Sequence, residues 1–337
     1  TFKNDGEAYH PQFGLRTFGP RGPSDVKSQT VDEFLQIRLG IIGSEESIDD
    51  FQKFLKRIEK PIPADPKKPV SYSFPGIGLT NPLKFNFITD QDWIFEIPPE
   101  DLAKCGKGTV KENARMAIEI FESEFEKANI EVEPKPDVFV ISIPKYILKK
   151  CSYPMTRRRI KIADRAGKYS SSDIYDFHNY LKIIAMQYPF VTQFVKPRTL
   201  DLESKGRSLQ EPSERAWNLT MAMYYKATGI PWKLAHFPKG TCFVGIGFVR
   251  IFTGGRANMQ ATMTQVFLKS GEHFVLRGEP FHWEHPKIKS PHLTKDQAAN
   301  LIKQIISVYK GQKKKLPERI VIQKTSQVWD DELEGFD

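Results

Sequence analysis

Short apolar runs that alternate with amphipathic segments constrain the fold of this chain more than any other feature of its sequence. Residues 37–43 and 137–144 are rich in Ile, Leu, Val and Phe, and both have the character of buried strands. Between them, residues 110–128 repeat apolar side chains at intervals of three and four, which predicts a long helix. Strand, helix and strand in this order are typical of a parallel sheet covered by helices. The sequence therefore predicts an α/β fold.

The turn G-I-I-G at residues 40–43 precedes a helix that we expect to begin after Ser47 as its N-cap. A strand, a glycine-containing turn and a helix make a Rossmann-like beginning. The turn lacks the G-x-G-x-x-G spacing of a dinucleotide-binding loop. We therefore expect it to serve packing and not dinucleotide binding.

Residues 172–193 place several phosphate-binding side-chain types close together. Ser172 is a suitable N-cap for a helix on which His178 and Lys182, four residues apart, are neighbours. Pro189 ends that helix, and a following strand carries Gln193. A cation, an imidazole and an amide arranged in this way could hold a phosphate. The simpler alternative is an ordinary amphipathic helix with a solvated lysine.

The positive charge of the chain is concentrated in one segment. Between Lys145 and Lys239 there are 18 Lys and Arg residues against 7 Asp and Glu, a local excess of 11, whereas the whole chain has a net charge of +9. The remainder is therefore slightly acidic. A basic segment of this kind favours a polyanionic partner.

Other classes of protein are disfavoured by the sequence. No apolar run approaches the ~20 residues of a membrane helix, and no cationic and apolar leader precedes the first predicted helix. Cys105, Cys151 and Cys242 fit neither a disulfide framework nor a zinc spacing and suit a reducing cytoplasm. His282 and His285 lack the H-E-x-x-H order, so no metal site is predicted.

The second half of the chain predicts a different order of elements. A helix over about residues 213–226 ends at Gly229, and residues 241–252 form an apolar strand. Residues 262–269 and 273–277 are expected to pair as a hairpin. A helix beginning at Thr294, with a capping box to Gln297, precedes another strand at residues 319–323. Strand, hairpin, helix and strand are the order of an RNase H-like domain.

These patterns divide the chain into an N-terminal arm (residues 1–36), a first domain (37–200) and a second domain (201–337). The closing run W-D-D-E-L-E-G-F-D (residues 329–337) predicts no element, and we expect the second domain to be incomplete at its C-terminus.

Two motifs carry a resemblance to a known family: A-W-N-L-T-M-A-M-Y-Y-K-A-T-G-I-P-W (residues 216–232) and T-C-F-V-G-I-G-F (residues 241–248). With the order of elements around them, they resemble the MID and PIWI domains of short, nuclease-inactive prokaryotic Argonautes, from about Ile37 to Phe336. The resemblance implies a Rossmann-like MID domain followed by an RNase H-like PIWI domain.

In that family a guide strand's 5′-phosphate is held by a Tyr-Lys pair, a Gln and a Lys that closes a later helix. The resemblance places His178 (in the position of the Tyr), Lys182, Gln193 and Lys226 in these roles. A lysine that complements its helix C-terminus is the alternative for Lys226. Tyr175 is a candidate for base stacking. Arg157, Arg158 and Arg159 are either backbone contacts or a solvated loop, and Mg²⁺ at the phosphate is the one cofactor considered.

Active relatives cut their target with carboxylates that hold two Mg²⁺ ions. The resemblance places Gly247 and Thr325 where two of these carboxylates would be, and neither side chain supplies a carboxylate to a divalent ion. Glu279, Asp330 and Asp331 do not match the missing positions and are interpreted as surface residues. The expected protein is therefore not an enzyme.

The resemblance implies a nuclease-inactive protein that binds a 5′-phosphorylated small guide, taken as RNA, and pairs it with complementary invader DNA. It also implies a heterodimer with a protein that joins a PAZ-analogue domain to a TIR, sirtuin-like or nuclease effector, which acts in prokaryotic defence against plasmids or phage. Two alternatives stay open: a guide-directed endonuclease with a non-standard metal site, and a non-guided nucleic-acid scaffold. The residues also leave open whether the guide is RNA or DNA.

Overall fold

The protein was analysed as a computed structural model, which describes residues 1–22, 34–68, 71–151, 177–204, 209–229, 231–235, 238–253, 256–261, 263–267, 273–277, 280–282 and 291–337. The chain forms two compact units. The described residues up to Lys233 belong to the first unit, and those from Leu234 to Asp337 belong to the second. Among the described residues, no helix is both long and apolar enough to cross a lipid bilayer.

The first unit is built on a parallel sheet. Its strands are β1 (Leu35–Gly43), β2 (Phe85–Ile88), β3 (Ile94–Glu96), β4 (Val138–Ser142) and β5 (Thr192–Val195). The main path through the sheet is β2-β1-β4-β5, and β3 also pairs with β1. All of these pairs are parallel. This confirms the predicted parallel α/β architecture and places β5 at one edge.

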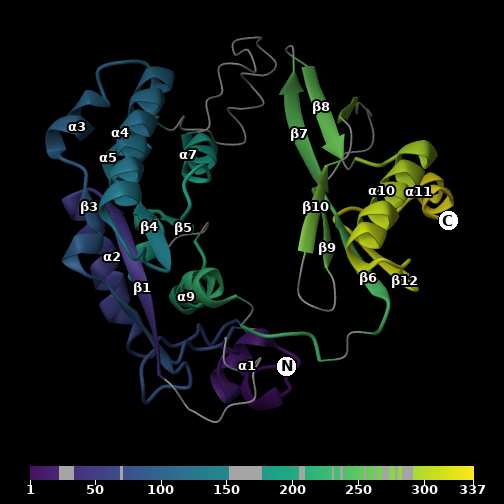
Figure 1. The fold of residues 1–337 in the computed structure, drawn as a ribbon, viewed down its shortest axis with the longest axis horizontal. Coiled ribbons are helices and arrows are strands. Elements are labelled where there is room, and N and C mark those ends of the chain that lie inside the picture. Colours follow the sequence, from purple (N-terminus) through teal and green to yellow (C-terminus); the bar gives the residue numbers. More distant parts are fainter. Residues whose placement is uncertain are drawn as a thin grey trace. The chain divides into compact units, whose positions relative to one another are not determined.

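Helices cover both faces of this sheet (Figure 1). The helices of the unit are α1 (Pro11–Phe18), α2 (Glu45–Ile58), α3 (Pro99–Lys104), α4 (Val110–Glu131), α5 (Lys145–Cys151), α7 (Phe177–Ala185), α8 (Pro197–Leu200) and α9 (Pro212–Thr228), with short 3-10 turns at Lys3–Asp5 and Gln91–Trp93. One core contains side chains of α2, α9 and one face of the sheet. The other contains side chains of α4, α5, α7 and the opposite face. The side-chain alternation of β4 shows both faces, because Val138 and Val140 enter the first core and Phe139 and Ile141 the second.

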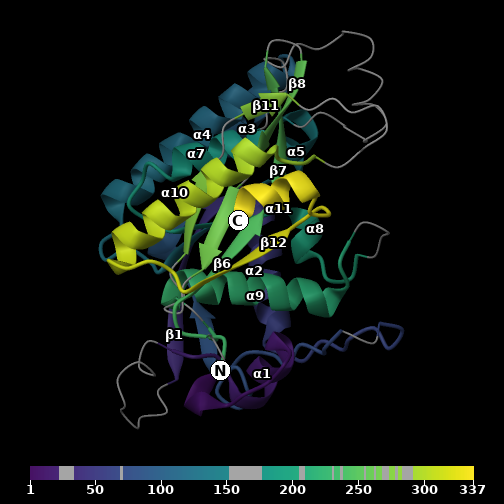
Figure 2. The same cartoon turned by 90° about the vertical axis from the view of Figure 1, so that its right-hand side faces the viewer.

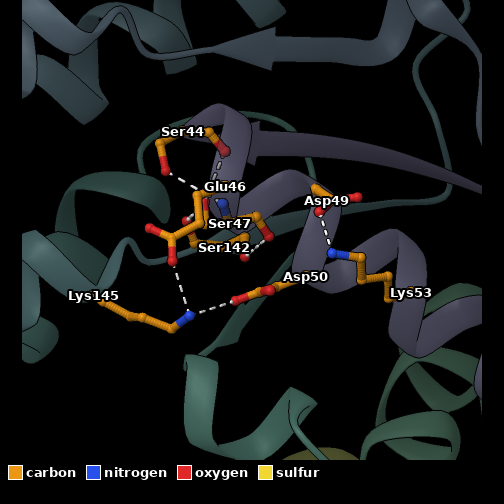
Figure 3. Close-up of polar contacts among 8 residues, drawn as sticks. All are labelled: Ser44, Glu46, Ser47, Asp49, Asp50, Lys53, Ser142 and Lys145. Carbon is orange, nitrogen blue, oxygen red and sulfur yellow. Dashed lines mark hydrogen bonds and ion pairs between the residues drawn. The ribbon is translucent and has the colours of Figure 1, made fainter.

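The carboxyl ends of β1 and β4 are joined by a network of serines at the beginning of α2 (Figure 3). Ser44 is the N-cap of α2, and its hydroxyl accepts from the Ser47 N–H, so the expected N-cap at Ser47 was wrong by one turn. The Ser47 hydroxyl instead donates to the Ser142 carbonyl at 2.9 Å, and the Ser142 hydroxyl donates to the Ser47 carbonyl at 2.7 Å. Lys145 completes the junction by pairing with Glu46 at 2.9 Å and Asp50 at 3.2 Å.

Open α/β sheets commonly bind their ligands outside the carboxyl ends of two neighbouring strands at which the strand order reverses. The junction of β1, β4 and α2 occupies this place. A Cβ on Gly43 would lie 2.5 Å from the Ser47 hydroxyl and 2.6 Å from the Ser142 carbonyl oxygen. Glycine is therefore needed here for close packing of the strand ends. The hydrogen bonds at the carboxyl ends of β1 and β4 join Ser47 to Ser142.

The second unit contains a mixed sheet in the order β10-β9-β6-β12 (Figure 1). Its strands are β6 (Thr241–Ile246), β9 (Met263–Phe267), β10 (His273–Arg277) and β12 (Arg319–Lys324). A smaller sheet has the order β11-β8-β7, with β7 (Phe248–Thr253), β8 (Arg256–Ala261) and β11 (Pro280–His282). The helices are α10 (Lys295–Lys313) and α11 (Asp330–Phe336). In Figure 2, α10 lies across β6 and β12, with α11 beside it.

The topology of the second unit is that expected of an RNase H-like fold. The predicted hairpin is present as the antiparallel pair β9 and β10, and β12 pairs in parallel with β6. The predicted capping box of α10 between Thr294 and Gln297 is also present. The long predicted strand at residues 241–252 is divided at Gly247 into β6 and β7.

Three further features differ from the sequence-based description. The N-terminal arm contains α1, and Phe2 and Leu15 are buried in the first core. The first compact unit extends to Lys233, so α9 packs in it although the sequence placed this helix in the second domain. The closing run, for which no element was expected, contains α11.

Candidate anion-binding site

Gln193 lies on the edge strand β5 with its side chain toward α9. Val195, two residues further on, enters the core that contains α9, whereas Phe194 packs against the opposite core. The Gln193 side-chain oxygen Oε1 accepts a hydrogen bond from Lys226 Nζ at 2.9 Å, and its Nε2 donates to the Phe194 carbonyl at 2.8 Å. The structure thus brings together two of the four side chains predicted to hold a phosphate.

Lys226 reaches this position because α9 is firmly packed. Trp217 and Tyr224 are fully buried on the sheet side of α9, and the helix ends at Gly229, whose φ of 96° favours glycine. Lys226 lies in the last turn and donates to the Thr192 carbonyl at 2.6 Å as well as to Gln193. Its ammonium therefore binds the neighbouring strand. These contacts go beyond the general role of a lysine that complements a helix C-terminus.

The electrostatics of this site are set by two neighbouring cations, Lys226 and Lys182. Burial lowers the pKa of Lys226, and the nearby positive charge of Lys182 lowers it further. The oxygens that Lys226 contacts belong to a carbonyl and an amide, both neutral. Among the residues that the structure describes, neither Lys182 nor Lys226 has a carboxylate partner within ion-pair distance. A bound anion would relieve this repulsion between like charges.

His178 approaches the same strand from the α7 side. The helix α7 buries Phe177, Leu181 and Ala185 and so fixes the place of His178 beside them. The imidazole packs edge-on against the Phe194 ring, with the ring centroids 5.6 Å apart. Lys182, one turn later on α7, is exposed. Two helices from opposite faces of the sheet therefore supply the basic groups around β5. Tyr175, Arg157, Arg158 and Arg159, named above as further contacts, lie outside the described residues.

The donor set of this site does not fit Mg²⁺, the cofactor considered from the sequence. Mg²⁺ requires oxygen ligands, and carboxylates are its usual protein ligands. The two oxygen atoms described near Lys226, Thr192 O and Gln193 Oε1, both accept hydrogen bonds from its ammonium. Among the described residues, no group of three His, Cys, Asp or Glu side chains is arranged to hold a metal. At this site the described residues offer hydrogen-bond donors to an anion and no carboxylate to a divalent cation.

Gly247 and Thr325 lie next to each other at the ends of the parallel strands β6 and β12. The Thr325 N–H donates to the Ile246 carbonyl at 3.0 Å, and a Cβ on Gly247 would be 4.0 Å from the Thr325 methyl group. Asp330 and Asp331 are exposed on α11, and Glu279 lies outside the described residues. The two positions that the resemblance assigned to metal-binding carboxylates are thus adjacent, and both are occupied by side chains without a carboxylate.

A buried ionic cluster beside Thr325 was not anticipated from the sequence. Lys324 and Glu332 pair at 2.9 Å with both side chains fully buried, and Lys324 Nζ lies 3.1 Å from His292 Nδ1. Glu332 also accepts from the N–H groups of Leu293 and Trp329 at 2.7 and 2.9 Å. Burial raises the pKa of Glu332, but these hydrogen bonds and the Lys324 charge lower it to a net value below normal. Burial and then Lys324 lower the pKa of His292. The cluster joins α11 to β12.

The three cysteines are free and buried, and none has the character of a nucleophile. Burial raises the pKa of Cys105 and Cys242 to about 11 and that of Cys151 to about 12. Their thiols are therefore protonated at neutral pH, and reactive cysteines require the thiolate.

No protein-family model matches this chain, and no curated protein matches its sequence. Solved structures that resemble it are Argonaute proteins. They include Argonaute of Aquifex aeolicus, with a TM-score of 0.41 and 14% identity over 99% of this chain and 36% of that one.

Two others were solved with nucleic acids. Marinitoga piezophila Argonaute in complex with a 5′ OH guide RNA has a TM-score of 0.39 and 11% identity over 93% of this chain and 39% of that one. Clostridium butyricum Argonaute bound to a guide DNA and a 19-mer target DNA has a TM-score of 0.44 and 12% identity over 88% of this chain and 33% of that one. The chain spans between 33% and 39% of the length of these three solved structures.

Proposed function

We propose that this chain binds the 5′-phosphate of a short nucleic-acid guide in its first unit and pairs the guide with a complementary strand. The observation that carries the proposal is the contact of Lys226 with Gln193 on β5, with Lys182 near enough to lower the pKa of Lys226. Neither lysine has a carboxylate counterion among the described residues. A terminal phosphate dianion needs several convergent donors, and charge-assisted hydrogen bonds are among the strongest available to it.

Binding of a phosphate requires only small changes at this site. Lys226 Nζ already lies between two neutral oxygens, and one of its three donor positions is free to point to an anion when the other two are occupied. Rotation of the Gln193 amide would turn its Nε2 from the Phe194 carbonyl toward the ligand. Lys182 adds a charge from α7. Such preorganised cations favour a terminal phosphate over a 5′-hydroxyl.

We propose further that the chain does not cut its target. Gly247 and Thr325 supply no carboxylate at the ends of β6 and β12, and a two-metal mechanism depends on such ligands. Pairing with a complementary strand would then act as a signal. The resemblance noted in the sequence supports transmission of this signal to an associated effector protein in prokaryotic defence, with RNA as guide and single-stranded DNA as target.

The first test compares one strand with either a 5′-phosphate or a 5′-hydroxyl, bound to the full chain at fixed salt. We expect tighter binding of the phosphorylated strand. Loss of one charge-assisted contact costs roughly 1.5–3 kcal/mol, so Lys182→Ala with Lys226→Ala should weaken phosphorylated-strand binding by at least tenfold and abolish the preference. Lys149→Ala with Lys196→Ala removes the same charge from exposed positions of the same unit and should leave the preference intact.

A second variant tests the site without changing its shape. Gln193→Glu keeps the size of the side chain and places a carboxylate against Lys226, at the loss of the hydrogen bond to the Phe194 carbonyl. The carboxylate should offset the charge of the ammonium and repel a phosphate. EDTA should leave the preference for the phosphorylated strand unchanged. Equal binding of the two strands by the wild-type chain would refute a 5′-phosphate site and favour a non-guided scaffold.

The absence of cutting is tested with guide, complementary target and either Mg²⁺ or Mn²⁺. We expect the labelled target to remain intact. Guide-dependent cleavage by purified protein that disappears after substitution of a carboxylate of this chain would refute the proposal.

The signalling role is tested by co-expression with a candidate effector and addition of target. It predicts effector activity only when guide and target are complementary.

A further inference from the structure

The helix α10 has two faces of different character. Ala298, Leu301, Ile305 and Tyr309 are buried in the core of the second unit with Cys242 and Val244 of β6. The opposite face consists of exposed polar side chains at helical spacing: Asn300, Lys303, Gln304, Ser307, Lys310 and Lys314. We call this set the outer face of α10.

The charge of the outer face and of the residues that follow it has a single sign. Between residues 297 and 317 the sequence contains five lysines, namely Lys303, Lys310, Lys313, Lys314 and Lys315, and no Asp or Glu. Lys310, Lys314 and Lys315 have no ion pair among the residues that the structure describes. Such a surface repels itself unless an anionic partner is bound.

The helices α2, α3 and α4 carry acids as well as exposed lysines. Lys53 pairs with Asp49 on α2 at 2.5 Å, and Lys104 pairs with Asp101 on α3 at 2.5 Å. On α4, Lys127 pairs with Glu124 at 2.7 Å. A solvated helix surface is expected to mix both signs in this way. The outer face of α10 does not follow this pattern.

Complementation of the helix dipole explains only part of the positive charge. Lys310 and Lys313 lie in the last turn of α10, where cations are favourable. Lys303 lies about two turns earlier, and the dipole effect is confined to the last turn. Lys314 is the C-cap, with a left-handed φ of 57°, and Lys315 lies beyond the helix. Lys314 and Lys315 are still close to the negative end of the dipole, whereas Lys303 lies outside the region that the dipole accounts for.

The length of the surface suits a nucleic-acid backbone. Lys303 and Lys314 are separated by eleven residues, or about 16 Å along a helix that rises 1.5 Å per residue. Phosphates of one strand of a duplex follow each other every ~3.4 Å of helix axis, so the outer face can contact several phosphates. Asn300, Gln304 and Ser307 add neutral donors between the lysines, and such groups are common partners of phosphate and sugar oxygens.

We propose that the outer face of α10 binds the phosphodiester backbone of a nucleic-acid strand without reading its sequence. This second site lies in the other unit of the chain and is separate from the 5′-phosphate site. It holds a strand or duplex along its length, and the lysines supply most of the interaction through release of counterions.

The test measures the binding of the full chain to a 5′-hydroxyl RNA–DNA duplex over a range of salt concentrations. The variant Lys303→Gln, Lys310→Gln, Lys314→Gln and Lys315→Gln removes four charges from exposed positions. Each lost phosphate contact reduces the slope of log K against log salt by about 0.9, so we expect the slope to become shallower by about 2 to 4. Affinity at low salt should fall by at least tenfold.

The matched control is Lys53→Gln, Lys56→Gln, Lys104→Gln and Lys111→Gln, which removes the same charge from exposed positions of α2, α3 and α4. Its slope should remain that of the wild-type chain. An unchanged slope in the α10 variant overturns the proposal. Equal changes of the slope in both variants also overturn it, because they would show an effect of net charge and not of this surface. The ratio of affinities for 5′-phosphate and 5′-hydroxyl strands should not change in the α10 variant, so the two sites can fail independently.

Discussion

At the scale of single residues, Lys226 is the group whose environment says most about its ligand. Its ammonium is half-buried, contacts two neutral oxygens and lies close enough to Lys182 for its pKa to be lowered from the ordinary 10.5 by burial and then by that charge. A bound phosphate would raise this pKa again, because an opposite charge favours the protonated form. Binding of a phosphorylated strand is therefore linked to proton uptake.

This linkage predicts a pH dependence with a definite sign. Below the lowered pKa of Lys226 the preference for a 5′-phosphate should be constant, and it should fall as the pH rises through that pKa. The measurement compares phosphorylated and hydroxyl strands made only of adenine and cytosine, from about pH 7.5 to about pH 9.5, where the phosphate itself stays a dianion. In Lys226→Arg, whose guanidinium stays charged, the preference should not vary with pH. A wild-type preference that increases with pH would contradict the assignment.

The pair of Lys324 and Glu332 gives a second prediction at this scale. Both side chains are fully buried, so Lys324→Met would leave the Glu332 carboxylate without its cation. Removing one partner of a buried pair costs about 3 kcal/mol or more. Hydrogen exchange of the α11 amides (Asp330–Phe336) should therefore become faster by roughly 100-fold. Lys295→Met breaks the exposed pair between Lys295 on α10 and Glu334 on α11, and it should leave this exchange nearly unchanged. Equal effects would show that the buried pair does not hold α11.

Individual residues show where the sequence was informative and where it was not. The resemblance noted in the sequence implied one site for Gln193 and Lys226, and the structure shows them in contact. The contact of Lys226 with the Thr192 carbonyl was not foreseen, since it depends on how α9 meets β5. The N-cap of α2 was misassigned because S-E-E-S offers two serines, and only the contact of Ser47 with Ser142 distinguishes them.

At the scale of elements, periodicity located the helices that bury a long apolar stripe, such as α4 and α10, and missed α11. Its seven residues, D-D-E-L-E-G-F, have no apolar period, and its stability comes from distant partners, namely Lys324 and the Leu293 N–H. The outer face of α10 was also overlooked. The sequence indicates this face by twenty-one residues (297–317) without an acid. The period of the apolar side chains locates only the buried face of the helix.

Substitution of glycine by alanine should have opposite effects at two positions, one at the junction of β1 and α2 and the other on α10. Gly43→Ala places a methyl group 2.5 Å from the Ser47 hydroxyl and 2.6 Å from the Ser142 carbonyl, so the strand ends must separate, at a cost of about 1–3 kcal/mol. Gly311→Ala, on α10, meets nothing within 4 Å and should stabilise its helix by about 0.5–1 kcal/mol. Urea denaturation of the two variants provides the measurement. A stable Gly43→Ala chain would show that the junction can relax.

At the scale of the whole molecule, the position of α9 decides where the first unit ends. The sequence placed a boundary after residue 200, because a polar segment follows it, whereas the described structure packs α9 into the first core and divides the chain after Lys233. Polarity marks an exposed connection, but it does not show which core the next helix enters. The question matters for function, since Lys226 lies on α9 and Lys182 and Gln193 lie before residue 200.

Two truncated chains distinguish these boundaries. A fragment of residues 1–233 keeps Trp217 and Tyr224, which pack against Phe74 and Phe85 with ring centroids 5.1 and 4.8 Å apart, and it should unfold cooperatively. A fragment of residues 1–200 loses both rings. Since loss of one buried aromatic side chain costs about 3–5 kcal/mol and a domain is stable by only about 5–15 kcal/mol, this fragment should not fold. Circular dichroism during thermal unfolding measures the difference.

The longer fragment should also prefer a 5′-phosphorylated strand, and this preference should disappear with Lys226→Ala. A cooperative transition in the 1–200 fragment would instead place the boundary before α9, and the anion site would then be completed from a separate domain.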